Sequence, residues 1–309
     1  MESPPPVSGP PVDSLTQRLR TSRRARQNEK ILQEKEVERK TEEQRVVTRE
    51  RTVPGEAFFS EAGGLFGFSG QFFARFWRRP FEAKELFNQM DEVGSKSLVL
   101  TGVVGFSIGI VLAMQSRGTL ARFGAESFLP SMLALSVIKE IGPVLTSLVL
   151  AGRLGAGMGA ELGSMRVTEQ IDALEVAALK PFHYLVVTRV LACIIMFPVM
   201  TMLTDFLALT GGYLEAWLSD GMDIRVFIAT AFDSLRFVDV IVDTMKTSIF
   251  GFIVGIVSCY LGYNVRGGTR EVGRAAMQAV VISSLLILVA DVVIVRASII
   301  LFGDISDAA

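Results

Sequence analysis

Long apolar segments separated by short polar ones dominate the chain after about residue 95. Each segment is long enough, at about 1.5 Å per residue, to cross a hydrocarbon core of about 30 Å as a helix. The pattern predicts an all-α integral membrane protein with five transmembrane helices, over residues 97–115, 128–151, 185–218, 247–264 and 275–302. The third segment is too long for one upright helix and too short for two spans with a turn. We therefore expect one tilted helix, bent at Pro198.

Residues 57–77 differ from these segments because aromatic side chains are interspersed with glycine and serine, and because Arg78, Arg79 and Pro80 follow directly. An aromatic-rich segment that is followed directly by cations is typical of the headgroup boundary rather than the bilayer centre. The composition predicts an interfacial helix. The segment is also long enough for a sixth true span, and the sequence leaves this alternative open.

Residues 1–52 carry dense charge of both signs and little apolar surface, which predicts a disordered cytoplasmic tail ahead of one membrane domain over residues 53–309. Residues 28–51 contain good helix formers, so a coiled coil is the alternative, although their apolar positions do not sustain a heptad. No cleavable secretory signal is expected at the start of the chain.

The positions of lysine and arginine near the span ends predict a cytoplasmic N-terminus. With this orientation, the inner side holds eleven cations: Arg75, Arg78, Arg79, Lys84, Lys96, Arg153, Arg166, Lys180, Arg266, Arg270 and Arg274. The outer loops hold five: Arg117, Arg122, Arg225, Arg236 and Lys246.

Composition excludes several classes of function. Half of the 309 residues are apolar and the net charge is −1, which argues against a nucleic-acid-binding protein. Cys193 and Cys259 lie far apart in apolar stretches, so we expect packing residues rather than a disulfide or zinc ligands. His183 is the single histidine, and a Ser/His or His–metal site therefore cannot be assembled within the chain. We expect no metal site.

The segment between the second and third predicted spans, residues 152–181, is the least lipid-like one between spans. Its first part is rich in small residues that permit close helix packing, and it lacks the GxxxxGK[ST] order of a nucleotide-binding loop. A short helix is predicted at about 168–180, with Thr168 as N-cap and Pro181 as terminator. Physical reasoning alone leaves a partner-binding helix and a plain loop helix equally open.

Charged residues inside the spans are the remaining signal. Lys139 and Glu140 lie about halfway along the second span, where each charge costs on the order of 2.5 to 3.5 kcal/mol unless it is paired or hydrated. We expect partners among Arg189, Asp205, Asp291 and Arg296. The pair either lines a substrate cavity or forms a buried structural ion pair. Pro143 follows Gly142 and is predicted to break the helix there, where broken helices line cavities. The candidates for the cavity or gate are Lys139, Glu140, Gly142, Pro143 and Asp291.

Three linked motifs give the chain a resemblance to a known family. They are Ile-Lys-Glu-Ile-Gly-Pro-Val at 138–144, Gly-Arg at 152–153, and Glu-Leu-Gly-Ser-Met-Arg-Val-Thr-Glu-Gln-Ile-Asp-Ala-Leu at 161–174. With these motifs in this order, residues from about 81 to 302 resemble the MlaE/YrbE family of permeases.

The resemblance implies an ABC-exporter-like permease in the bacterial inner membrane, forming a homodimer with two cytoplasmic ATPase subunits and an MCE-domain lipid-binding protein on the outer side. ATP and Mg would be bound by the ATPase, and this chain would bind no cofactor. The resemblance also implies a coupling helix that docks on the ATPase, formed by Glu169, Gln170, Ile171, Asp172, Ala173 and Leu174.

The expected function is therefore that of a non-catalytic permease that moves phospholipid or a related lipid between the inner membrane and the outer carrier. An ion-coupled secondary transporter is one alternative, with Lys139, Glu140, Asp205 and Asp291 as its ion path. A membrane scaffold without transport is the other.

Overall fold

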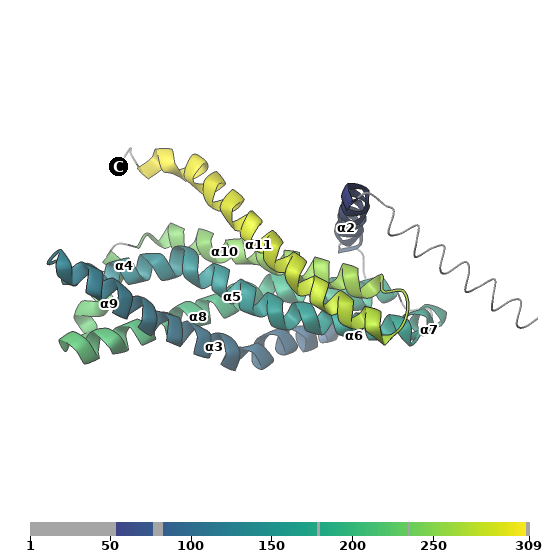
Figure 1. The fold of residues 1–309 in the computed structure, drawn as a ribbon, viewed down its shortest axis with the longest axis horizontal. Helices are drawn as coiled ribbons and strands as arrows, with labels where there is room; N and C mark the ends of the chain where they lie inside the picture. Colours follow the sequence, from purple (N-terminus) through teal and green to yellow (C-terminus); the bar gives the residue numbers. More distant parts are fainter. Residues whose placement is uncertain (1–53, 77–82, 178–179, 234, 307–309) are drawn as a thin grey trace, which may run out of the picture. The chain divides into compact units, whose positions relative to one another are not determined.

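The computed structural model describes residues 54–76, 83–177, 180–233 and 235–306, and every regular element within these ranges is helical (Figure 1). The chain divides into two compact units, Met1–Gly63 and Gly64–Ala309. Helix α2 (Pro54–Phe76) begins in the first unit, and all later helices lie in the second. The predicted tail, residues 1–52, lies outside the described residues.

Five helices are long and apolar enough to cross a membrane, which confirms the predicted number of spans. Their bounds are Ala83–Arg122, Glu126–Val167, Phe182–Asp220, Val240–Tyr263 and Thr269–Ile300. Among the described residues, α2 is not one of them, so nothing supports a sixth span. In its second half, the rings of Phe68 and Phe182 lie 5.0 Å apart between centroids, edge to face, and those of Phe72 and Phe252 lie 5.7 Å apart. This half of α2 therefore packs on the spans.

The first span, α3 (Ala83–Arg122), starts well before the predicted residue 97. Its polar first turns are helical because side chains four residues apart pair along the surface. Gln89 donates to Glu85 at 2.9 Å, and Lys96 pairs with Glu92 at 2.6 Å. The apolar segment marks the membrane-crossing part of this helix, while the pairs extend it toward solvent.

The second span is longer than predicted and is not broken at Pro143. It runs through α4 (Leu129–Ser136), a π-helical segment (Val137–Ile141), α5 (Gly142–Leu150), a second π-helical segment (Ala151–Gly155) and α6 (Ala156–Val167). The predicted break is wrong because Pro143 occupies the first turn of α5, where a missing N–H is tolerated.

Residues 152–167 belong to the second span rather than to the segment between spans, and two of their glycines make the close helix packing that the small residues predicted. Gly159 faces Ala276 of α11 (Thr269–Ser306), and Gly163 faces Val272 of the same helix. A Cβ at either position would lie 3.2 or 3.3 Å from its neighbour. Small residues here allow close approach rather than a turn.

The third span is one helix, as predicted, with Pro198 inside it. A π-helical segment (Phe182–Val187) leads into α8 (Thr188–Asp220), which lies at the centre of the bundle. It packs on α3 and on α10 (Phe237–Tyr263). Cys193 and Cys259 are free and buried, which agrees with the predicted packing role.

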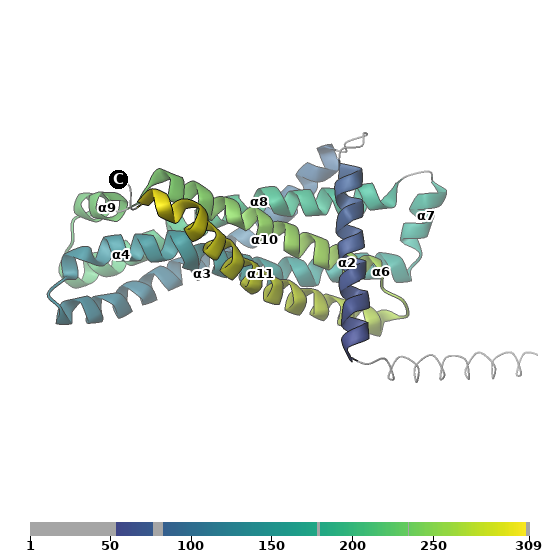
Figure 2. The same cartoon turned by 90° about the horizontal axis from the view of Figure 1, so that it is seen from above.

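The two ends of the bundle carry different elements (Figure 2). The short helix α7 (Gln170–Val176) and the turn between α10 and α11 lie at one end, and α9 (Ile224–Asp233) lies at the other. We call these the α7 end and the α9 end. At the α9 end, Arg117 Nε donates to Asp220 Oδ2 at 2.9 Å and joins α3 to α8.

Two glycines of α3 provide a matched test of this packing. A Cβ on Gly109 would overlap the carbonyl of Ala208 in α8, whereas a Cβ on Gly118 would meet nothing within 4 Å. We expect Gly109→Ala to destabilise the fold by about 1 to 3 kcal/mol through overpacking, although alanine favours helix. Thermal unfolding in detergent should show a lower Tm for Gly109→Ala and an unchanged or higher one for Gly118→Ala. Equal shifts would contradict the close α3–α8 contact.

Candidate functional site

A buried ammonium group joins three spans near the middle of the bundle. Lys246 of α10 is only 3% exposed. Its Nζ lies 3.2 Å from Glu140 Oε2 on the π-helical segment of the second span, 3.4 Å from Asp291 Oδ1 on α11, and 3.9 Å from Asp243 Oδ1 on its own helix. We call Lys246 and these three carboxylates the Lys246 cluster.

The carbonyl of Lys139 accepts a hydrogen bond from the buried ammonium group. Lys139 lies on the π-helical segment Val137–Ile141, shortly before Pro143 in α5, and Lys246 Nζ donates to its carbonyl at 2.6 Å. A hydrogen bond from a charged donor is stronger than one between neutral groups, so this contact helps to hold the ammonium group in the interior.

The structure brings some of the predicted site residues together and places others elsewhere. Asp291 joins Glu140 through Lys246, as expected of a partner, whereas Arg189 instead pairs with Glu161 at 2.7 Å. The carbonyl of Lys139 belongs to the cluster. Gly142 lies against Asp205 of α8, because a Cβ on this glycine would overlap the Asp205 carboxylate.

Lys246 is the functional candidate that the sequence interpretation missed, since it was counted among the cations of the outer loops. Asp243 and Lys246 interrupt the apolar pattern before residue 247, so the predicted span began seven residues after the start of the observed one at Val240. Their spacing of three residues, which places opposite charges on one helix face, is the signal that could have identified a buried pair.

Polar groups continue around the cluster. Asp205 is 7% exposed and interacts electrostatically with Lys246 and Asp243. Its Oδ1 has no hydrogen-bond partner within the described residues, and the same holds for the hydroxyl oxygens of Thr146 of α5 and Ser283 of α11. Buried polar atoms in a membrane protein are typical of an interior that water can reach.

The short helix α7 is the second feature of the candidate site. It starts later and ends earlier than the predicted 168–180. Thr168 is not its N-cap: this residue ends α6, where its hydroxyl donates to the Ser164 carbonyl at 2.9 Å. Glu169 is the N-cap and has a left-handed backbone with φ of 58°. That conformation turns the chain sharply between α6 and α7.

One face of α7 is anchored and the other is open. Ile171 is fully buried in the main core, and Leu174 packs against that core. Arg166 Nη1 donates to Asp172 Oδ1 at 2.7 Å across the turn. Glu169, Gln170, Asp172 and Ala173 are exposed, and Val176 is 90% exposed. The outer face is therefore acidic with an apolar tip.

No group of three or more His, Cys, Asp or Glu side chains in the described ranges is arranged to hold a metal ion. The charges of the site instead pair with one another.

Comparison with known proteins gives a consistent result. Residues 86–297 match the family described as Permease MlaE. A probable ABC transporter permease protein of Rickettsia typhi is 38% identical over 237 residues, covering 76% of this chain and 92% of the relative. A probable ABC transporter permease protein of Synechocystis is 33% identical, covering 75% of this chain and 89% of the relative. The chloroplastic protein TRIGALACTOSYLDIACYLGLYCEROL 1 of Arabidopsis thaliana is 31% identical, covering 73% of this chain and 65% of the relative.

Removal of the buried ammonium should be far more damaging than removal of an exposed one. Lys246→Met leaves three partly exposed carboxylates and the Lys139 carbonyl without their cation, and we expect a loss of about 1 to 3 kcal/mol. Lys96→Met removes an exposed i,i+4 pair and should cost less than about 1 kcal/mol. Thermal unfolding of both variants in detergent measures the difference. Similar Tm values for the two would contradict the buried cluster.

Proposed function

Since this chain belongs to the MlaE permease family, we propose that it moves a phospholipid or related lipid across or out of the membrane, with energy from a partner ATPase. It is an ABC transporter permease and a multi-pass membrane protein, and it is a transport subunit rather than an enzyme. ATP and Mg would be bound by the ATPase. The observation that carries the proposal is α7, a short helix that is exposed on one face and anchored in the core on the other.

Under this proposal, α7 is the coupling helix, formed by Glu169, Gln170, Ile171, Asp172, Ala173 and Leu174. Its acidic outer face complements a basic groove on the ATPase, and Val176 supplies an apolar contact. The buried side chain of Ile171 and the Arg166–Asp172 pair tie the helix to α6. Movement of α7 on ATP binding would then pull α6 with it.

The path from α7 to the Lys246 cluster follows packed elements. Helix α6 packs on α10 and α11, and these two helices carry Lys246 and Asp291. The second span also continues from α6 back to Glu140 without a break. A displacement of α6 would therefore change the surroundings of the cluster, which we propose lines or gates the lipid cavity together with Lys139, Gly142 and Pro143.

The lipid substrate is supported by one relative's name. The name of the Arabidopsis protein contains the name of a galactolipid, a membrane lipid with two acyl chains. The exposed apolar surface of α11 agrees with a lipid-lined path or with a second copy of the chain. It includes Val281, Leu285, Val289 and Val292 at helical spacing. We propose a homodimer that encloses the cavity with these faces.

The proposed orientation puts the N-terminus and the α7 end in the cytoplasm of a bacterium, with the chain in the inner membrane. The α9 end then faces outward, where an MCE-domain lipid-binding protein would receive or deliver the lipid. Helix α9 carries exposed Ile224, Ile228 and Phe232, which suit contact with such a partner or with the membrane surface.

The Lys246 cluster favours one rival, an ion-coupled transporter, because three carboxylates surround its buried ammonium group. Proteoliposomes that hold the chain with its co-purified ATPase can separate the two functions. We expect transfer of a fluorescent phospholipid to require ATP and to persist when an ionophore removes the proton gradient. Transfer without ATP that stops with the ionophore would favour the rival.

Charge reversal on α7 tests the coupling role. Asp172→Lys removes the pair with Arg166 and reverses one charge of the exposed face, and we expect at least about tenfold less co-purified ATPase. Val176→Asp alters the exposed tip without touching the core and should also weaken association.

The matched control is Glu126→Lys, since Glu126 is exposed just after α3, away from α7. Membrane insertion should be unchanged in all three variants. Retention of the ATPase by both α7 variants would rule out the coupling role and would agree with a scaffold.

A further inference from the structure

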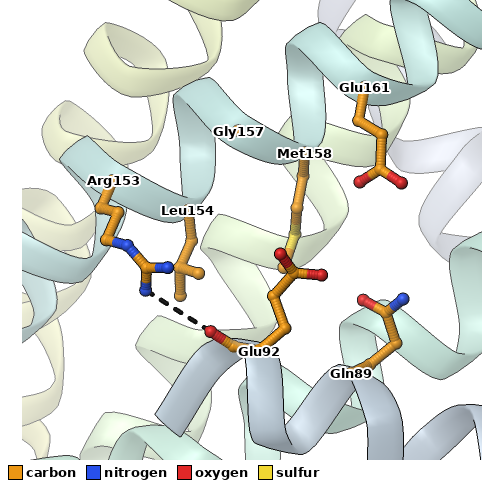
Figure 3. Close-up of a pocket in the computed structure, with 7 residues that line it drawn as sticks. All are labelled: Gln89, Glu92, Arg153, Leu154, Gly157, Met158 and Glu161. Atoms are coloured by element: carbon orange, nitrogen blue, oxygen red, sulfur yellow. Dashed lines mark hydrogen bonds between the residues drawn. The ribbon is translucent and has the colours of Figure 1, made fainter. Parts of the chain in front are cut away.

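An open cleft separates the end of the second span from α3 (Figure 3). Its volume is about 230 Å³. Gln89 and Glu92 line it from α3, while Gly157, Met158 and Glu161 line it from α6. Helix α6 packs on α10 and α11, and among the described helices it makes no comparable contact with α3. One face of α6 therefore has room to move.

The π-helical segment Ala151–Gly155 lies where α6 leaves the rest of the second span. Long helices bend most sharply at such segments, because the ladder of backbone hydrogen bonds changes its register there. A Cβ on Gly152 would meet nothing within 4 Å, so no neighbouring group crowds a bend at this position. The segment therefore has the features of a hinge for α6.

Arg153 fixes this segment to α3. Its Nη1 donates to the Ser97 hydroxyl and, at 3.5 Å, to the Glu92 carbonyl. Ser97 is fully buried, so the contact is shielded from water, and a charged donor strengthens it. In Figure 3, Arg153 lies at one end of the cleft and Glu161 toward the other. The second span is therefore held to α3 at the hinge and is separated from it farther along α6.

The far end of α6 carries α7. Helix α6 has 12 residues, which span about 18 Å at 1.5 Å per residue. The sharp turn at Glu169 then leads into α7. A force on α7 thus acts on one end of a short lever, and Arg153 holds the other end.

The side chains that face each other across the cleft favour its closure. The amide of Gln89 lies across from the carboxylate of Glu161 (Figure 3). This amide has two N–H groups and donates to Glu85 at 2.9 Å. Its second N–H is available to Glu161 once the cleft narrows, and a hydrogen bond to a carboxylate is a strong one.

We propose that Arg153 is a positioning residue that holds the hinge of α6, and that α6 swings into the cleft when the partner ATPase moves α7. The inference rests on the proposed coupling role of α7 and adds a direction of movement to it. Gly159 and Gly163 keep α6 in close contact with α11, so α11 follows the swing. Asp291 of α11 would then shift relative to Lys246.

The width of the cleft can be measured on the full chain in nanodiscs, without ATPase or ATP. Nitroxide labels at Ser95→Cys on α3 and Ser164→Cys on α6 report it by pulsed EPR, since both positions are exposed. Cys193 and Cys259 are buried and do not react with the label. Dilution with unlabelled chain restricts the measured distances to one copy.

Release of the hinge should be visible in this measurement. We expect Arg153→Met to broaden the distance distribution about twofold, because α6 then loses its attachment to α3. Lys84→Met removes an exposed cation of the same helix α3 and should leave the distribution unchanged. An unchanged distribution in Arg153→Met would overturn the role of Arg153.

The partner of Arg153 provides a further test that general destabilisation would not pass. Ser97→Ala removes the acceptor on α3 and should broaden the distribution as Arg153→Met does. The two substitutions together should add little to either one, because they break the same contact. Arg153→Lys keeps a charged donor and should restore the narrow distribution. Additive broadening, or none in Ser97→Ala, would contradict the pin.

Gly157 offers a way to block the swing. A Cβ at this position would meet nothing within 4 Å, so Gly157→Phe adds a ring to the cleft without a backbone clash. Gly118→Phe is the matched control, since Gly118 also has open space around it and lies on α3 outside the cleft. Gly157→Ala adds only a methyl group and should have a much smaller effect.

The swing itself is measured with the co-purified ATPase and a non-hydrolysable ATP analogue. We expect the label distance to shorten in the unaltered chain and in Gly118→Phe, and to stay constant in Gly157→Phe. With ATP, lipid transfer by Gly157→Phe should fall at least about tenfold while the ATPase still co-purifies, because the outer face of α7 is unchanged.

Full transfer by Gly157→Phe, or a distance that shortens in this variant as in the unaltered chain, would overturn the swing. A constant distance in the unaltered chain during ATP-dependent transfer would also overturn it and would leave the transport function standing. Failure of the ATPase to bind the unaltered chain would remove the coupling role of α7, and the swing with it. The role of Arg153 is decided on the chain alone in either case.

Discussion

The hydrogen bond from Lys246 to the carbonyl of Lys139 is the contact on which the interior of the bundle depends. Burial of an unpaired ammonium group costs several kcal/mol in an apolar interior. The carbonyl of Lys139, together with the carboxylates of Glu140 and Asp291, offsets that cost. The second, fourth and fifth spans therefore meet at one charge. A change in any one of these spans alters the balance at that charge.

The sequence predicted the number of spans because the hydrophobic effect sets it, and apolar length is visible in the sequence. It did not predict where the helices end. The first turns of α3 are polar and helical through pairs such as Lys96–Glu92, which no hydropathy pattern reports. Residues 152–167 were expected between two spans, although their small residues predicted close helix packing. Gly159 and Gly163 do pack on α11, and they do so as part of the second span itself.

The candidate site was predicted in part for a similar reason. Glu140 and Asp291 stand out because charges are rare in apolar segments. Lys246 does not, because Asp243 precedes it and makes the region look like the end of a loop. The turn before α7 was also misassigned by one residue, since Thr168 has good capping chemistry. The left-handed backbone at Glu169 depends on the packing of α6 and Ile171 and is not encoded by residue type.

Among the described residues, the second span supplies an acidic partner to each of two buried cations. Glu140 pairs with Lys246 of α10, and Glu161 pairs with Arg189 of α8. The two acids are 21 positions apart, which is about 31 Å along a helix at 1.5 Å per residue. One continuous helix thus connects a cation in the middle of the bundle with a cation near α7. In each pair the cation is buried and the acid is about half exposed, so an axial shift of this helix would withdraw the acid from both buried cations together.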